Sequence, residues 1–371
     1  MKIGILTHPL MYNYGGILQN YALQCVLKDL GHEVLTVDRR PNYKYGISIY
    51  AIVDYLRRLC YNAPQHRVTR WNPILPINQA EYCAVSSNIN TFIEKNIDRT
   101  VACFDDELSA IDDRYKFDCY VVGSDQVWGP GCCPLMFIDF SKRCDVIKLF
   151  YAASAGEKTW MDVPEKLDMC LRLSKQFRAI SVREEELRRT AESVLYRQVQ
   201  VVLDPTMLLD VNRYFDEGLE PSQEKNYVFA YILDNTSVKQ DSILKATSFL
   251  DTSLVSGFTI DNSKIIKTAL PSVEEWIDKM YNAQYIVTDS FHGCVFAILF
   301  KKQFSVIVNK KRGQNRFFTL LSKFGLLDRI VFDDNGIEKN INTPIDYKSI
   351  EELLVEEREK SLYFIKSSLQ E

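Results

Sequence analysis

Residues 2–38 read KIGILTHPLMYNYGGILQNYALQCVLKDLGHEVLTVD, a pattern that predicts a strand, a loop, a helix and a second strand. Lys2–Thr7 is a short apolar run, and Ile17–Leu30 carries apolar residues at helical spacing up to Gly31, a residue typical of helix ends. Val34–Val37 is the second apolar run. Strands joined through a helix usually pair in parallel, so this opening predicts an α/β fold.

The same alternation of apolar runs and helical stretches returns downstream. Further strands are predicted at Cys119–Val122, Lys148–Ala153, Ala179–Val182, Val199–Leu203, Tyr227–Leu233, Ser253–Gly257, Tyr285–Thr288 and Ser305–Asn309. Helices are predicted between them, at Pro164–Phe177, Glu184–Val194, Ser237–Leu250, after the capping box Ser272–Glu275, and from Gly293. At about 150 residues per domain, the length of 371 residues suggests two domains.

We therefore predict two Rossmann-like parallel-sheet domains that face each other across a cleft, residues 1–206 and 207–340. The first domain contains an irregular insertion, residues 39–116, with helical stretches at Tyr50–Cys60 and Val85–Ile97. Residues 341–371 form a C-terminal helix, which is expected either to pack back onto the first domain or to mediate a homodimer.

Composition excludes several classes of protein. There are 45 Lys and Arg against 49 Asp and Glu, a balance that argues against a nucleic-acid partner. The longest apolar runs fall short of the ~18 residues of a membrane span, and the N-terminus lacks a signal-peptide pattern, so a cytoplasmic protein without an integral membrane segment is expected. The 10 cysteines contain no C-x-x-C pair, so we expect apolar fillers rather than a zinc site or disulfides.

Polar and glycine residues gather where predicted strands end. They occur at 13–16, 123–125, 154–156 and 289–292, and at Arg183 and Asp204. In doubly wound folds these strand ends form the ligand site. Asn13-Tyr14-Gly15-Gly16 precedes a helix and is either an anion-binding loop or a tight turn.

Three basic features each allow two interpretations. His292 either transfers protons or makes a capping contact at the start of its helix. Arg183 either binds a phosphate or carboxylate, or pairs with Glu184–Glu186 on the surface. The cluster of Lys310, Lys311, Arg312 and Arg316 either binds an anionic ligand or forms a solvated loop.

Known motifs for other chemistries are absent. The sequence contains no G-x-G-x-x-G, no P-loop, no G-x-S-x-G and no H-E-x-x-H. Asp125 and Asp289 are candidates for an acid and base pair across the cleft. No cluster of metal ligands is visible, so no essential metal is expected.

Taken in order, the loops resemble the polysaccharide pyruvyl transferase family. The matching stretches are Asn13–Leu23, Val122–Trp128, Tyr151–Gly156, Ser181–Glu184, Val202–Thr206 and Thr288–Ala297, with a weaker match at Asn315–Phe317. The resemblance extends over residues 1 to about 330. Each motif alone has low specificity, and it is their number and order that carry the resemblance.

The resemblance implies a fold similar to the two-domain GT-B glycosyltransferases. It also implies transfer of pyruvate from phosphoenolpyruvate (PEP) to two hydroxyls of a sugar as a cyclic ketal, in cell-surface polysaccharide biosynthesis. PEP is then a co-substrate and no cofactor is needed, while the sugar acceptor is carried on a nucleotide or a lipid phosphate. A glycosyltransferase with a nucleotide-sugar donor and a non-catalytic binding protein for sugars or phosphates remain the alternatives.

The resemblance also suggests roles for individual residues. His292 matches the family's catalytic histidine, with Asp289 beside it, and Arg183 matches a donor-site arginine. The residues expected to bind the donor or its phosphate are Arg183, Ser290, Arg312, Arg316, Asn13, Gly15 and Gly16. The residues expected to line the acceptor side of the cleft are Gln19, Ser124, Asp125 and Ser154, with help from the insertion.

One position departs from the family pattern. Many members have Arg-Leu-His where this chain has Ser290-Phe291-His292. Either Ser290, the helix start and Arg312 or Arg316 compensate for the missing charge, or the donor differs.

Overall fold

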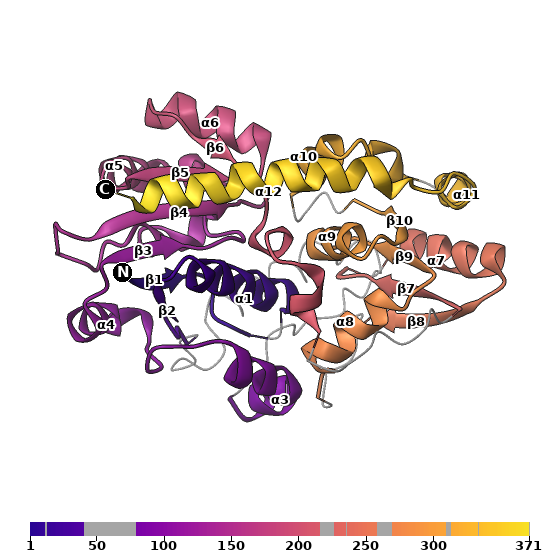
Figure 1. Cartoon of the computed structure of the whole chain (residues 1–371), viewed down its shortest axis with the longest axis horizontal. Coiled ribbons are helices and arrows are strands. Elements are labelled where there is room, and N and C mark those ends of the chain that lie inside the picture. Colours follow the sequence, from indigo (N-terminus) through magenta and orange to yellow (C-terminus); the bar gives the residue numbers. More distant parts are fainter. Residues whose placement is uncertain are drawn as a thin grey trace, which may run out of the picture.

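The computed structural model describes residues 1–11, 13–40, 79–215, 226–234, 236–257, 269–308, 313–332 and 334–370. The N-terminal part is built on a six-stranded sheet in the order β2-β1-β3-β4-β5-β6 (Figure 1), in which all neighbouring strands are parallel. Its strands are β1 (Lys2–Leu6), β2 (Glu33–Thr36), β3 (Cys119–Val122), β4 (Ile147–Ala153), β5 (Ala179–Val182) and β6 (Gln200–Val201). This is the sheet that the opening strand–helix–strand pattern predicts.

The C-terminal part contains a second parallel sheet of four strands, in the order β10-β9-β7-β8. Its strands are β7 (Tyr227–Tyr231), β8 (Ser253–Gly257), β9 (Tyr285–Thr288) and β10 (Gln303–Val306). β7 and β9 are buried throughout, as expected for a parallel sheet covered on both faces. The predicted fold class, two parallel-sheet α/β domains, is confirmed.

Helices cover both sheets. They are α1 (Tyr14–Asp29), α3 (Gln79–Asn96), α4 (Leu108–Tyr115), α5 (Pro164–Ser174), α6 (Glu185–Leu195), α7 (Ser237–Leu250), α8 (Val273–Tyr281), α9 (Phe291–Leu299), α10 (Asn315–Lys323), α11 (Asp334–Asn342) and α12 (Tyr347–Leu369). The capping box expected at Ser272 and Glu275 starts α8. α3 contains all of the stretch predicted at Val85–Ile97 except its last residue, whereas the stretch predicted at Tyr50–Cys60 lies outside the described residues.

The long helix α12 runs from the C-terminal part back along the first sheet (Figure 1). Its Arg358 donates hydrogen bonds to the carbonyl oxygens of Met207 and Leu209, the latter at 2.9 Å. Its Ser361 Oγ accepts a hydrogen bond from Leu203 N at 3.0 Å. α12 therefore ties the chain segment that joins the two sheets to the face of the first.

The two halves also pack directly against each other. The ring of Tyr14 in α1 stacks on Trp276 in α8 with ring centroids 5.5 Å apart, and Tyr14 Oη donates to Pro271 O at 2.9 Å. Asn88 Nδ2 donates to Leu270 O at the same distance, 2.9 Å. One continuous hydrophobic core includes residues from both sheets. These contacts hold the strand ends of the two halves close together.

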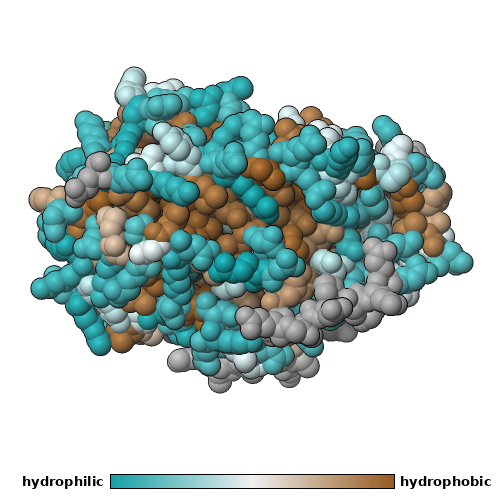
Figure 2. All heavy atoms as spheres, viewed as in Figure 1, coloured by the Kyte–Doolittle hydropathy of each residue, from teal (hydrophilic) through white to brown (hydrophobic). Residues whose placement is uncertain are grey.

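The face of the molecule seen in Figure 2 is mainly hydrophilic, with hydrophobic atoms gathered in the region of α1 and α12. Partly buried Cys25, Leu30 and Leu362 pack against the core there. No helix in the described ranges is long and apolar enough to cross a membrane.

The structure corrects one expectation about the cysteines. Cys133 and Cys170 form a disulfide, although both were expected to be free apolar fillers. Cys133 and Cys170 are buried in one core cluster, where the fold brings together positions 37 residues apart. The other described cysteines are free: Cys25, Cys103, Cys119, Cys132, Cys144 and Cys294.

Candidate active site

Asp204, which follows β6, lies at the centre of the strand-end loops. Its carboxylate is fully buried, and Oδ2 accepts hydrogen bonds from Ser124 Oγ at 2.8 Å and from Arg183 Nη1 at 2.6 Å. Oδ1 accepts hydrogen bonds from the backbone nitrogen of Thr206 at 3.0 Å and from its hydroxyl at 2.6 Å. One carboxylate thus joins the loops after β3, β5 and β6, as expected where parallel strands end at one edge.

Arg183 is the residue directly after β5, and its side chain is only 2% exposed. Besides its bond to Asp204, Nη2 lies 3.5 Å from Asp125 Oδ1. Within the described part of the chain, Nε and Nη2 of Arg183 have no hydrogen-bond partner. The interpretation of Arg183 as a surface residue paired with Glu184–Glu186 is therefore wrong. Its guanidinium group is buried and binds Asp204, while Glu185 pairs with Arg188 on the surface.

His292 enters the same cluster from the second half. It is the second residue of α9, and Nε2 lies 3.7 Å from Asp204 Oδ2, which is too long for a hydrogen bond. Among the described residues, this buried Nε2 atom has no hydrogen-bond partner. Asp204 Oδ2 thus lies next to both Arg183 and His292, and each of these side chains keeps buried nitrogen atoms without a hydrogen-bond partner in the described residues.

The opening glycine loop contacts this histidine. A Cβ atom on Gly15 would lie 2.0 Å from His292 Nδ1, far inside contact distance. Glycine is therefore required at position 15 for the start of α1 to approach the imidazole.

The two carboxylates of the cluster are held in their ionised form. Burial alone would raise the pKa of Asp204, but the interactions with His292, Arg183 and Thr206 outweigh it and hold that pKa well below its usual range. Burial likewise opposes ionisation of Asp125, and Arg183 and His292 together lower its pKa. Near neutral pH both aspartates are therefore negatively charged and face the positive charge of Arg183.

Asp125 also has an unusual backbone. Its φ angle is +79°, a left-handed conformation that few non-glycine residues adopt. The Asp125 carbonyl accepts hydrogen bonds from Val127 N at 2.7 Å and from Ser154 N at 3.0 Å. Such conformations cluster at functional sites, where the surrounding structure holds them.

Phe291, the first residue of α9, lies beneath two guanidinium groups. Arg183 Cζ is 4.6 Å from the ring centroid, and Arg316 Cζ, from α10, is 5.6 Å from it. Arg316 is buried as well. Cation–π contacts thus bring a second arginine close to the cluster, and two guanidinium groups suit a ligand with a carboxylate and a phosphate.

Several other predicted site residues serve the backbone. Asn13 Oδ1 accepts a hydrogen bond from Gly16 N at 3.2 Å and caps α1, and Ser290 Oγ accepts one from Gly293 N at 3.3 Å and caps α9. Gln19 Nε2 donates to the carbonyl oxygen of Gly16 at 2.9 Å. Both helices therefore begin at the cluster.

Two more predicted residues make side-chain hydrogen bonds to partners other than Asp204. Ser154 donates a hydrogen bond to Glu184, which lies next to Arg183 in the chain. Asp289 is fully buried, and its oxygens accept hydrogen bonds from Leu233 N, Asp234 N and Lys239 Nζ. These contacts lie within the C-terminal half and favour a role for Asp289 in shaping the loop after β7. Arg312 lies outside the described residues.

The structure adds residues to which the sequence assigned no role. Asp204 was visible as a strand-end residue, but nothing in the sequence marked it as the common partner of Arg183 and His292. Phe291 and Glu184 are next to the predicted site residues His292 and Arg183 in the chain. This adjacency is the only feature of the sequence that could have indicated a role for them. Their roles depend on side-chain directions that the sequence does not specify.

The two parallel-sheet domains define a GT-B-like fold, and a buried arginine, histidine and aspartate lie together where the two halves meet. Residues 13–311 match the polysaccharide pyruvyl transferase family. This chain belongs to that family and is a transferase. No curated protein sequence matches it.

Solved structures of low sequence identity share the fold. UDP-GlcNAc 2-epimerase from Methanocaldococcus jannaschii matches with a TM-score of 0.56 at 11% identity, over 94% of both chains. UDP-GlcNAc 2-epimerase from Neisseria meningitidis, bound to UDP-GlcNAc, matches with a TM-score of 0.51 at 12% identity, over 100% of this chain and 99% of that one. At such identities the likeness concerns the fold alone.

Proposed function

We propose that this protein transfers pyruvate from PEP to two hydroxyls of a sugar as a cyclic ketal, in cytoplasmic steps of cell-surface polysaccharide biosynthesis. The observation that carries the proposal is the placement of Arg183 and His292 around Asp204 Oδ2, at 2.6 and 3.7 Å. Arg183 Nε and Nη2 and His292 Nε2 are buried atoms without hydrogen-bond partners in the described ranges. Such atoms are costly unless a ligand or water satisfies them.

The charges near the cluster suit PEP as the donor. PEP carries a carboxylate and a phosphate, and guanidinium groups bind both in a bidentate manner. The guanidinium groups of Arg183 and Arg316 both lie over the aromatic ring of Phe291. We assign Arg316 the charge that Ser290 lacks relative to the family pattern, while Ser290 caps the helix that carries His292.

The proposed reaction balances with two proton transfers. In the first step the oxygen of one sugar hydroxyl bonds to C2 of PEP, and the hydroxyl proton, carried by His292 Nε2, ends on C3 to form a methyl group. In the second step the oxygen of the other hydroxyl bonds to C2 as the C2–O bond to phosphate breaks. Phosphate leaves with the second proton, and neither step needs a cofactor.

The test of the donor is the unfolding midpoint with and without PEP. A ligand at 100 times its dissociation constant stabilises by about 2.7 kcal/mol, which raises Tm by a few degrees for a protein of this size. We expect this shift with PEP and its loss in Arg183→Ala. We also expect His292→Ala to retain the PEP shift but to release no phosphate when PEP and sugar acceptors are supplied. Phosphate release by His292→Ala at the wild-type rate would remove the catalytic role.

A nucleotide-sugar donor is the second candidate, favoured by Ser290 at the position of the family's arginine. The Neisseria meningitidis epimerase of similar fold is bound to UDP-GlcNAc. A Tm shift with UDP-GlcNAc and none with PEP would establish this alternative. Ligand binding without phosphate release or glycosyl transfer would instead indicate a non-catalytic binding protein.

A further inference from the structure

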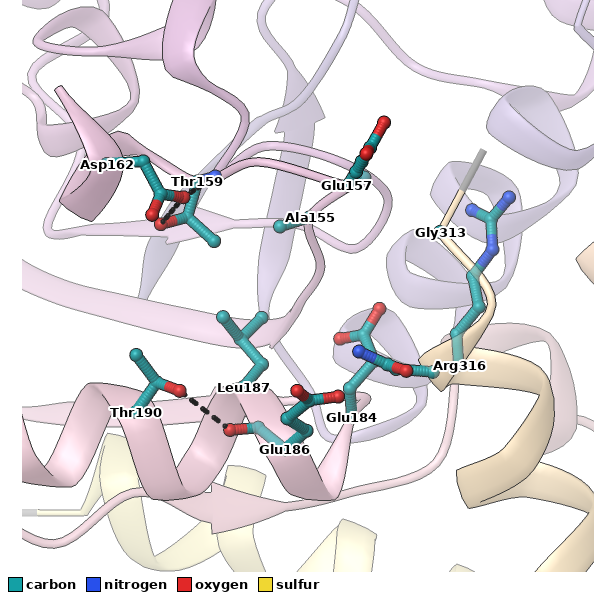
Figure 3. Close-up of a pocket in the computed structure, with 12 residues that line it drawn as sticks. Ala155, Glu157, Thr159, Asp162, Glu184, Glu186, Leu187, Thr190, Gly313 and Arg316 are labelled. Carbon is teal, nitrogen blue, oxygen red and sulfur yellow. Dashed lines mark hydrogen bonds between the residues drawn. The ribbon is translucent and has the colours of Figure 1, made fainter. Parts of the chain in front are cut away.

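A pocket of about 200 Å³ is lined by residues other than Asp204, Arg183 and His292 (Figure 3). Its walls are the loop after β4, the first two turns of α6 and the start of α10. The residues that form these walls include Ala155, Gly156, Glu184, Leu187, Thr190 and Arg316. The volume is below the ~300–1,000 Å³ of pockets that enclose drug-sized ligands, so the pocket suits a small group such as one sugar ring.

Glycines shape one wall of this pocket. Gly313 has a φ angle of +86°, and a Cβ atom on it would lie 3.2 Å from the Gly156 backbone. The segment before α10 therefore approaches the loop after β4 closely. This contact places Arg316, three residues further along, at the rim (Figure 3).

The charges around the pocket are mostly negative. Glu157, Asp162, Glu184 and Glu186 line it, with Arg316 as the cation among the described lining residues. An anion such as PEP would be repelled by these carboxylates. A hydroxyl group, by contrast, can donate to a carboxylate and accept from a guanidinium.

Glu184 supplies an acceptor that needs a donor. The residue is only 3% exposed, and its carboxylate accepts a hydrogen bond from Ser154 Oγ. Its second oxygen, Oε2, is buried without a hydrogen-bond partner anywhere in the described chain. Because Glu184 lines the pocket, a ligand bound there that donates a hydrogen bond would satisfy this oxygen.

The pocket adjoins the proposed donor site through two residues, Glu184 and Arg316. Arg183 and Glu184 are consecutive residues after β5, and one contacts Asp204 while the other lines the pocket. Arg316 lines the pocket and also lies 5.6 Å from the centroid of the Phe291 ring, above which Arg183 lies. A sugar ring in the pocket would therefore lie beside the proposed donor site.

We propose that this pocket is the acceptor subsite and binds one uncharged pyranose ring, with Glu184 Oε2 accepting a hydrogen bond from a ring hydroxyl. The assignment rests on the proposed function, because it takes the Arg183–His292 cluster as the donor site.

The test uses methyl pyranosides as probes with the full chain. Methyl β-galactoside, methyl β-glucoside and methyl α-mannoside are titrated to tens of millimolar, and binding is followed by saturation-transfer NMR. We expect at least one of them to bind to the wild type, and its dissociation constant to rise about tenfold or more in Glu184→Ala, because a hydrogen bond to a charged group is lost. Thr190→Trp, a change at an exposed position of the rim, should block binding by filling the pocket.

Glu185→Ala is the matched control. Glu185 is the next residue in the chain, pairs with Arg188 and Arg189 at the surface and does not line the pocket. It should retain the wild-type affinity. Absence of binding to the wild type, or wild-type affinity in Glu184→Ala or in Thr190→Trp, would overturn the subsite.

The experiments test the proposal that PEP is the donor and the proposal of the acceptor subsite independently. A Tm shift with PEP in the wild type, without binding of any pyranoside, would remove the subsite and leave the donor. Binding of a pyranoside that depends on Glu184, without a PEP shift, would support the subsite and remove PEP as the donor. Loss of the PEP shift in Thr190→Trp would show that the pocket holds the donor itself and would also overturn the subsite.

Discussion

Gly15 and His292 are in direct contact across the two halves of the molecule, with the position of a Cβ at residue 15 only 2.0 Å from His292 Nδ1. The contact joins the first residues of α1 to the first residues of α9. The spacing between the two helix starts is therefore set by the absence of a side chain. The position of the proposed proton carrier depends on that spacing.

Gly15→Ala should displace His292 and reduce activity. Alanine is favoured over glycine within a helix by up to about 1 kcal/mol, but an overlap of this size costs about 1–3 kcal/mol, so the net effect is destabilising. We expect a lower Tm together with a larger fall in the rate of phosphate release. Gly131→Ala is the control, since a Cβ there meets nothing within 4 Å among the described residues. Equal behaviour of the two variants would show that the contact is not functional.

Asp204→Asn should be strongly destabilising near neutral pH. The change removes the charge that both Arg183 and His292 face, and loss of one partner of a buried ion pair costs about 3–5 kcal/mol. The pKa of Asp204 is lowered in the folded state, so its contribution to stability is complete above the ordinary carboxyl pKa of about 3.9 and is lost as the pH falls below it. Urea unfolding at several pH values should show that the free energy of unfolding of the wild type exceeds that of Asp204→Asn. This difference should be constant from pH 7 to about pH 5 and should decrease at lower pH. A difference that persists unchanged at about pH 3 would contradict this account.

The sequence predicts the loops of the site better than it predicts the roles of their residues. Apolar runs mark the strands, so the residues that follow them, such as Arg183 and His292, could be placed at one edge of the sheets. Successive side chains of a strand point to opposite faces, so the direction of a side chain at a strand end depends on the exact residue at which the strand ends. Asp289 pairs with Lys239, whereas His292, three residues later, lies near Asp204. The disulfide between Cys133 and Cys170 likewise depends on tertiary packing, and neither residue has a local signature.

Phe291→Leu should weaken donor binding while the fold is retained. The ring lies beneath both guanidinium groups, and each such contact contributes about 0.5–2 kcal/mol. Leucine is similar in volume and is the residue of the family pattern, but it offers no π face. We expect the dissociation constant for PEP, measured by calorimetry, to rise several-fold, with a small change in Tm. Phe318→Leu, at an exposed position of α10, is the control and should leave the dissociation constant unchanged. An unchanged constant in Phe291→Leu would show that the ring does not position the arginines.

Glu184→Gln should stabilise the protein, and the effect should depend on pH. Burial raises the pKa of the Glu184 carboxyl above its ordinary value, against the opposing effects of Arg183 and of the hydrogen bond from Ser154. With a raised pKa in the folded state, the wild type is favoured below the ordinary pKa of about 4.3 and loses stability as the pH rises through the folded value. Glutamine carries no such cost, so the Tm of Glu184→Gln should exceed that of the wild type at pH 8 and approach it near pH 4.

Glu185→Gln is the control and should have the opposite effect. Hydrogen bonds from Arg188 lower the pKa of Glu185, so removal of the Glu185 charge should slightly lower Tm at neutral pH. A Glu184→Gln variant that is less stable than the wild type at pH 8 would mean that the buried carboxylate is fully compensated without a ligand. The reason to expect a sugar hydroxyl at Oε2 would then be lost.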